Sequence, residues 1–93
     1  MNNKIKKIAN HYGVQKQCIQ SMEECGELIQ AIAKVQRSSG QDDLIRAKNH
    51  LYEEIADVNI MIEQLKYLLQ LSGIRINNEM NNKLDRQIER IEK

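Results

Sequence analysis

The sequence contains no proline, no phenylalanine and no tryptophan, and it has only three tyrosines. A chain of 93 residues without large aromatic side chains can build only a thin core from Ile, Leu, Val, Met and Ala. Small helical chains of this kind often complete their core by pairing with a copy of themselves. We therefore expect one domain, residues 1–93, that assembles as a homodimer or homotetramer.

Other absences narrow the class of protein. No run approaches ~18 consecutive apolar residues, so no membrane span is expected, and no apolar segment follows the basic start as a secretory signal requires. The 14 basic and 13 acidic residues nearly cancel, which argues against a partner that is a nucleic acid polymer or a membrane. Cys18 and Cys25 lie seven positions apart on one expected helix, roughly 10 Å, too far to form a disulfide. We expect reduced cysteines and a cytoplasmic location.

The hydrophobic pattern is typical of helices throughout, because no period-two alternation runs for more than a few residues. Gly13 is expected to end a first helix, the segment 38–40 forms a loop, and Asp42 and Asn77 are the expected N-caps of the last two helices. The expected helices cover about residues 3–12, about residues 14–37, about residues 42–72, and a last segment after Gly73. The fold class is therefore all-α, an antiparallel bundle of about four helices.

Each expected helix has an apolar stripe that we assign to the core. In the first two helices the stripes are Ile5 and Ile8, then Cys18, Met22, Cys25, Ile29 and Ile32. In the last two they are Leu44, Leu51, Ile55, Val58, Ile62, Leu65 and Leu69, then Met80, Leu84, Ile88 and Ile91.

Two short acidic segments repeat the same spacing. Glu24 and Glu27 are three residues apart, as are Glu54 and Asp57, so each pair shares one helix face. Pairs of this kind are usually solvated, but the residues that share a face with Glu54 are Leu51, Val58, Met61 and Leu65. Those on the face of Glu24 are Leu28, Ala31 and Val35. A carboxylate on an apolar face must be paired, protonated or bound to a metal ion.

No basic residue lies on these faces to pair with the acids, so a divalent cation is the simplest partner. An all-oxygen ligand set suits Mg²⁺, or alternatively Mn²⁺. A di-iron site would need Glu-x-x-His, and a zinc site would need a Cys/His cluster. His50 precedes Glu54 by four residues, so it either supports the site or is an ordinary surface histidine.

The two segments together resemble a known family. Glu24-Cys25-Gly26-Glu27-Leu28 followed by Glu54-Ile55-Ala56-Asp57-Val58 is similar to the E-x-x-E … E-x-x-D signature of the MazG-like, all-α NTP pyrophosphohydrolases. The resemblance covers about residues 8–86. Each half of the signature is weak alone, whereas both in this order in a helical chain of this length are fairly specific.

The resemblance implies an enzyme that hydrolyses a nucleoside or deoxynucleoside triphosphate to the monophosphate and pyrophosphate. It implies that Glu24, Glu27, Glu54 and Asp57 are catalytic Mg²⁺ ligands and that helices are shared between subunits. Glu23 looks like the first Glu of the family's E-E-x-x-E form and either supports catalysis or faces solvent. No Ser-His-Asp arrangement or P-loop is present, so only a metal-dependent mechanism is supported by the sequence.

Substrate contacts are expected from two places. Lys83 and Arg86 resemble the basic stretch that follows E-x-x-D in the family; they either contact the triphosphate or belong to a solvated basic stripe. Gln17 and Gln20 precede Glu24 by seven and four residues and offer hydrogen bonds to a base or sugar, although surface glutamines are common.

Two other function classes stay open on the sequence alone. The chain could be a helical nucleotide-binding or regulatory module that keeps the site without turnover, or a structural helical dimer. The four acids separate the enzyme from the structural dimer, whereas only an assay separates the enzyme from the binding module.

Overall fold

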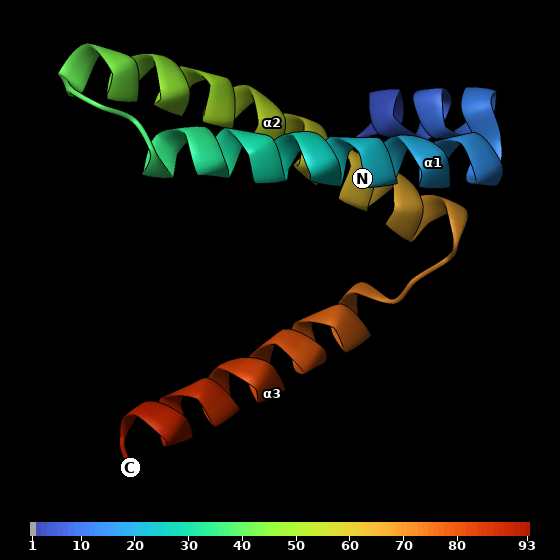
Figure 1. The fold of residues 1–93 in the computed structure, drawn as a ribbon. Helices are drawn as coiled ribbons and strands as arrows, with labels where there is room; N and C mark the ends of the chain where they lie inside the picture. Colours follow the sequence, from blue (N-terminus) through green and yellow to red (C-terminus); the bar gives the residue numbers. More distant parts are fainter. Residues whose placement is uncertain (1) are drawn as a thin grey trace.

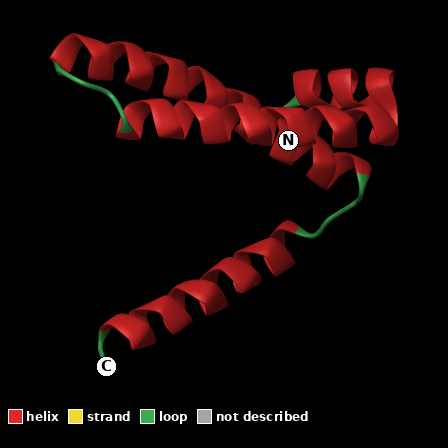
Figure 2. Cartoon of the chain, in the orientation of Figure 1, coloured by secondary structure: helices red, strands yellow, loops and turns green. Residues whose placement is uncertain are grey.

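The computed structural model describes residues 2–93, and helices account for nearly all of them. They are α1 (Asn3–Gln36), α2 (Gln41–Leu68) and α3 (Gly73–Ile91), and no strand occurs among the described residues (Figures 1 and 2). The all-α prediction is confirmed. Within the described residues, no helix is both long enough and apolar enough to cross a membrane.

α1 consists of two helical pieces joined at a kink. The side chain of Asn2 caps its start by accepting a hydrogen bond from the backbone N–H of Lys4 (2.7 Å). Gly13 interrupts the helix with φ of 82° and ψ of 174°, a backbone conformation that is open to glycine and strained for other residues. The first helix expected from the sequence therefore does end at Gly13, and the first piece doubles back beside the second (Figure 1).

The loop between α1 and α2 reverses the chain direction in a few residues. Ser38 Oγ donates to the carbonyl oxygen of Val35 (2.8 Å), and Gly40 takes φ of 84° as the N-cap of α2. The prediction of Asp42 as the N-cap is wrong, because Asp42 already lies in the first turn. Asp43 reaches back instead, and its Oδ2 accepts from the backbone N–H of Ser39 (3.0 Å). The acidic charges of this turn suit the positive end of the helix dipole.

The end of α2 and the start of α3 also differ from expectation. α2 ends at Leu68 because Gln70 adopts φ of 54°, so that the N–H of Leu71 reaches the carbonyl of Lys66 (2.9 Å), as in a Schellman motif. α3 then begins at once, with Ser72 rather than Asn77 as its N-cap; the Ser72 side chain accepts from the N–H of Arg75 (3.2 Å).

α1 and α2 pack against each other as an antiparallel hairpin, and they supply nearly all contacts between helices (Figure 1). The buried apolar residues are Ala9, Ala31 and Ala47. Small side chains at these positions let the helix backbones approach closely. The hydrogen bond from Tyr67 Oη to Asn10 Oδ1 (3.0 Å) ties the first piece of α1 to the end of α2.

Several stripes assigned to the core are exposed in the single chain. On α1, Met22 is 67% exposed and Ile29 is 68% exposed, because the side that carries the acids faces α2 instead. Ile8, on the first piece of α1, is also exposed, and its neighbour Ala9 is buried in its place.

α3 diverges from the hairpin and has no buried residue (Figure 1). Its expected core residues are all exposed: Met80, Leu84, Ile88 and Ile91. On α2, Ile55, Ile62 and Leu69 are exposed as well. A bundle of four helices is therefore not closed within one chain.

Candidate metal centre

Four carboxylates converge between the two helices of the hairpin. Glu24 and Glu27 come from α1, and Glu54 and Asp57 come from α2. Each offers a carboxylate oxygen, and these oxygens all lie within 4.8 Å of one another. The i, i+3 spacing puts each pair on one helix face, and the antiparallel packing of α1 on α2 brings the two faces together.

Two of these carboxylates are held in surroundings that leave an oxygen without a partner. Glu54 is only 7% exposed, and its Oε2 is buried with no hydrogen-bond donor. Oε2 of Glu24 is likewise buried and unpaired, although the residue as a whole is half-buried. The apolar neighbours expected from the sequence are buried or half-buried: Leu28, Ala31, Val35, Leu51, Val58, Met61 and Leu65. Buried anionic oxygens without donors are costly unless a cation occupies the site.

The pKa of Glu24 is raised above its ordinary value of 4.5. The hydrogen bond that Gln20 Nε2 donates to Glu24 Oε1 (2.8 Å) is the largest single influence and acts in the opposite direction. Burial of the carboxylate, the negative charges of Asp57 and Glu27, and hydrogen bonding with Asp57 together outweigh it. Repulsion from Asp57 and Glu27 therefore contributes to the raised pKa of Glu24.

His50 lies one turn before Glu54 on α2, at the edge of the cluster. Its Nε2 is 3.8 Å from Oε1 of Glu54, and its Nδ1 is 3.9 Å from Oε2 of the exposed Glu53. The side chain of His50 is 41% exposed. It therefore lies close to the Glu54 carboxylate, beyond hydrogen-bond distance, while staying in contact with water.

An open cavity of about 440 Å³ lies beside the cluster, near the kink in α1. Gln17 and Gln20, both expected to contact substrate, line it together with Tyr12. Gln17 is 3% exposed, and its Oε1 has no hydrogen-bond donor. Gln17 thus has a buried acceptor without a donor, three positions before Gln20, the residue that holds Glu24.

Two residues on this side of the hairpin, Lys16 and Gln64, were not predicted from the sequence. Lys16 lines the cavity, as does Met61, which the sequence placed on the face of Glu54. Gln64 is fully buried, and neither its Nε2 nor its Oε1 has a partner. Its position three residues after Met61 and four before Leu68 was the available signal, because that spacing puts it on the inner face of α2.

Three expected site residues lie outside the cluster. Glu23 is exposed on α1 and is not among the converging carboxylates. Lys83 and Arg86 are exposed on α3, where they line a shallow hollow with Gln87 and Arg90. Because α3 diverges from the hairpin, the single chain does not bring these two cations to the acids (Figure 1).

Comparisons with protein-family models, with curated proteins and with solved structures found no match to this chain. The resemblance to the MazG-like family is therefore carried by the two acidic motifs alone. The geometry of the four carboxylates is an independent observation, because it follows from the packing of α1 on α2.

The donor set fits a hard divalent cation. All four candidate ligands are carboxylate oxygens, and no thiolate or imidazole belongs to the cluster among the described residues. Such ligands suit Mg²⁺ or Mn²⁺ better than zinc or copper. The unpaired buried oxygens of Glu24 and Glu54 are the atoms that a cation would satisfy.

Proposed function

We propose that the protein is a Mg²⁺-dependent pyrophosphohydrolase that converts a nucleoside or deoxynucleoside triphosphate to the monophosphate and pyrophosphate. The observation that carries the proposal is the convergence of Glu24, Glu27, Glu54 and Asp57, with buried oxygens that have no donor. The E-x-x-E … E-x-x-D resemblance supplies the reaction class and the position of the cut.

The four carboxylates hold the cation in this proposal. Mg²⁺ held there would supply neutralisation of phosphate charge and activation of a water molecule. On α1, Gln20 fixes Oε1 of Glu24 through its hydrogen bond. On α2, His50 lies within 4 Å of Glu54. A carboxylate of the cluster accepts the proton of the attacking water.

The cavity near the kink is the proposed place for the base and sugar. Gln17 has a buried acceptor without a donor, and Tyr12 offers a ring face, although the chain lacks Phe and Trp for stronger stacking. The cavity also exposes Lys16, whose charge suits an anionic substrate. It adjoins the acids through Gln20, so one ligand can occupy both places.

A second copy of the chain completes the fold in this proposal. The exposed apolar residues of α1 and α3 need a cover, and the resemblance implies helices shared between subunits. A homodimer or homotetramer would bring Lys83 and Arg86 of one subunit to the acids of another. Their role in binding the triphosphate depends on that assembly.

Product analysis tests the proposal. The protein is incubated with Mg²⁺ and each of the four common ribonucleoside and four deoxyribonucleoside triphosphates, and the products are separated by anion exchange. We expect monophosphate and pyrophosphate, and no turnover by a Glu54→Gln preparation purified in the same way. Diphosphate and orthophosphate as direct products would refute the assignment. Binding without turnover of any of the eight would establish a non-catalytic nucleotide-binding module instead.

A further inference from the structure

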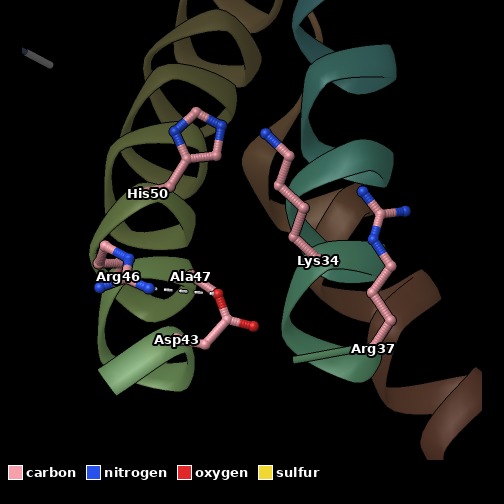
Figure 3. A pocket seen from close by; sticks show the side chains of 6 residues that line it. All are labelled: Lys34, Arg37, Asp43, Arg46, Ala47 and His50. Carbon is pink, nitrogen blue, oxygen red and sulfur yellow. Dashed lines mark ion pairs between the residues drawn. The ribbon is translucent and has the colours of Figure 1, made fainter. Parts of the chain in front are cut away.

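A second cavity, of about 400 Å³, lies between the helices at the loop end of the hairpin. α1 contributes one of its lining residues, the C-cap of α1 contributes another, and α2 contributes four (Figure 3). They are Lys34, Arg37, Asp43, Arg46, Ala47 and His50. We call this cavity the basic cleft.

The charge of the basic cleft is unlike that of the chain as a whole. Basic and acidic residues nearly balance over the sequence, yet this cleft is lined by three permanent cations and a single carboxylate, that of Asp43. That carboxylate is 3.6 Å from Arg46. Among the described residues, Lys34 and Arg37 have no carboxylate within ion-pair distance. The cleft therefore has spare positive charge for an anion.

Helix-end electrostatics explains only part of this arrangement. Lys34 and Arg37 are at the carboxyl end of α1, where cations are favourable. Arg46 lies beyond the first turn of α2, so no helix end accounts for it. Its side chain is 73% exposed despite the ion pair with Asp43, which leaves most of its donors free.

The basic cleft adjoins the metal centre at His50. This residue lines the cleft, and its Nε2 is 3.8 Å from Glu54. Along the helices, Lys34 follows Glu27 by seven residues and Arg46 precedes Glu54 by eight, roughly 10–12 Å at the rise of an α-helix. Long Lys and Arg side chains shorten that gap. A polyphosphate whose inner phosphate is at the acids can therefore extend its outer phosphates into the cleft.

We propose that the basic cleft binds the outer phosphates of the triphosphate, and hence pyrophosphate once it is released. This inference rests on the proposed function for its choice of ligand. Arginine guanidinium groups bind phosphate oxygens in pairs, whereas lysine acts as a point charge. Arg37 and Arg46 would form the bidentate contacts from opposite walls, with Lys34 between them and the acids.

Binding of inorganic pyrophosphate in EDTA tests the cleft without any metal or turnover. Calorimetry compares the wild type with the double variant Lys34→Gln/Arg46→Gln. Loss of two charge-assisted contacts should weaken binding at least about tenfold. The matched control is Lys48→Gln/Arg75→Gln, which removes the same charges from exposed positions outside the cleft and should change affinity less than about twofold.

Asp43→Asn tests the same idea in the opposite direction. It removes the negative charge beside Arg46 and keeps an oxygen that can accept from Ser39 N–H. Pyrophosphate affinity should rise about two- to fivefold at low salt, in line with one partly screened charge pair. Circular dichroism of each variant confirms that the helices are intact.

The outcomes separate this inference from the proposed function. If pyrophosphate binds and the cleft variants alter it as expected, but no triphosphate is hydrolysed, the cleft stands and the enzyme proposal fails. If hydrolysis proceeds while the double variant and its control bind pyrophosphate equally, the cleft proposal is overturned. The proposal would also be overturned if the wild type bound a single-stranded oligonucleotide about as tightly as pyrophosphate and the double variant lost both to the same extent. The cleft would then be a site for a nucleic acid partner.

Discussion

Glu54 is the most buried of the four carboxylates, so its charge is the one that most needs a metal ion to offset it. Glu54→Gln keeps the shape and removes that charge. In EDTA the melting temperature should hold or rise, because repulsion with Glu24, Glu27 and Asp57 is relieved. Mg²⁺ should no longer raise the melting temperature, and hydrolysis should fall about 100-fold or more. Thermal melts in EDTA and in Mg²⁺, beside a turnover assay, measure these effects.

A matched control for this variant is the same substitution at the neighbouring residue. Glu53→Gln makes the same chemical change at an exposed position outside the cluster, and it should leave both melts and turnover nearly unchanged. The basic side chain within 4 Å of Glu54 is His50, which is partly in water, so Gln leaves no buried charge behind. A large loss of melting temperature in EDTA, or normal activity, would contradict the metal-site role of Glu54.

Glu24 gives the metal-free protein a distinctive pH dependence. Its pKa is raised in the folded state, so the folded protein binds this proton more tightly than the unfolded chain. The resulting stabilisation is complete below the ordinary value of 4.5 and is lost as the pH rises through the folded-state pKa. In EDTA we expect the melting temperature to fall as the pH rises from 4.5 through the raised pKa of Glu24, and to fall less in Glu24→Gln.

Saturating Mg²⁺ should reverse this trend for the wild type, because metal binding requires deprotonated carboxylates. Differential scanning calorimetry at several pH values, with and without the metal, measures both slopes. Gln20→Leu serves as a second comparison, since it removes the hydrogen bond that opposes the pKa shift. Equal slopes for wild type and Glu24→Gln in EDTA would show that Glu24 is not the group responsible.

At the scale of the helices, the sequence predicted which segments are helical better than it predicted where each helix begins and ends. The break at Gly13 was predictable because glycine ends an apolar pattern there and tolerates the positive φ that the break needs. The end of α2 was not predictable, since Gln70 occupies the left-handed position with no glycine to signal it. With that stop hidden, the expected helix ran four residues too far and the cap at Ser72 was missed.

Periodicity also left the orientation of each helix open. It showed that the large apolar residues of α1 share a side, but not that this side faces away from α2. The inner side instead carries small or polar residues, such as Gln17, Ser21 and Ala31, which allow close approach of the two backbones. The convergence of the acid pairs, in contrast, follows from their spacing, because i, i+3 pairs on two antiparallel helices need only the hairpin to bring them together. The basic cleft is formed by side chains from both ends of a loop. No repeated spacing in the sequence indicated that these side chains would come together.

At the scale of the whole molecule, the single chain is too open to bury its own apolar surface. Its radius of gyration is 16.6 Å, against about 12 Å for a compact domain of this length. The fully buried apolar side chains are alanines, whereas Met22, Ile29 and the apolar face of α3 are exposed. A monomer of this shape would expose far more contiguous apolar surface than is usual. Sedimentation velocity at micromolar concentration should therefore give a dimer or tetramer of the 10.9 kDa chain.

Ile29→Asp places a charge on the exposed apolar side of α1 without touching the acid cluster. If that side is the interface, the variant should sediment near 10.9 kDa. Hydrolysis should fall with it, because Lys83 and Arg86 do not reach the acids within one chain. Gln30→Asp adds the same charge at the next exposed position and is the control, expected to keep assembly and activity. A wild type that sediments as a monomer, or an Ile29→Asp monomer with full activity, would show that each chain forms its site alone.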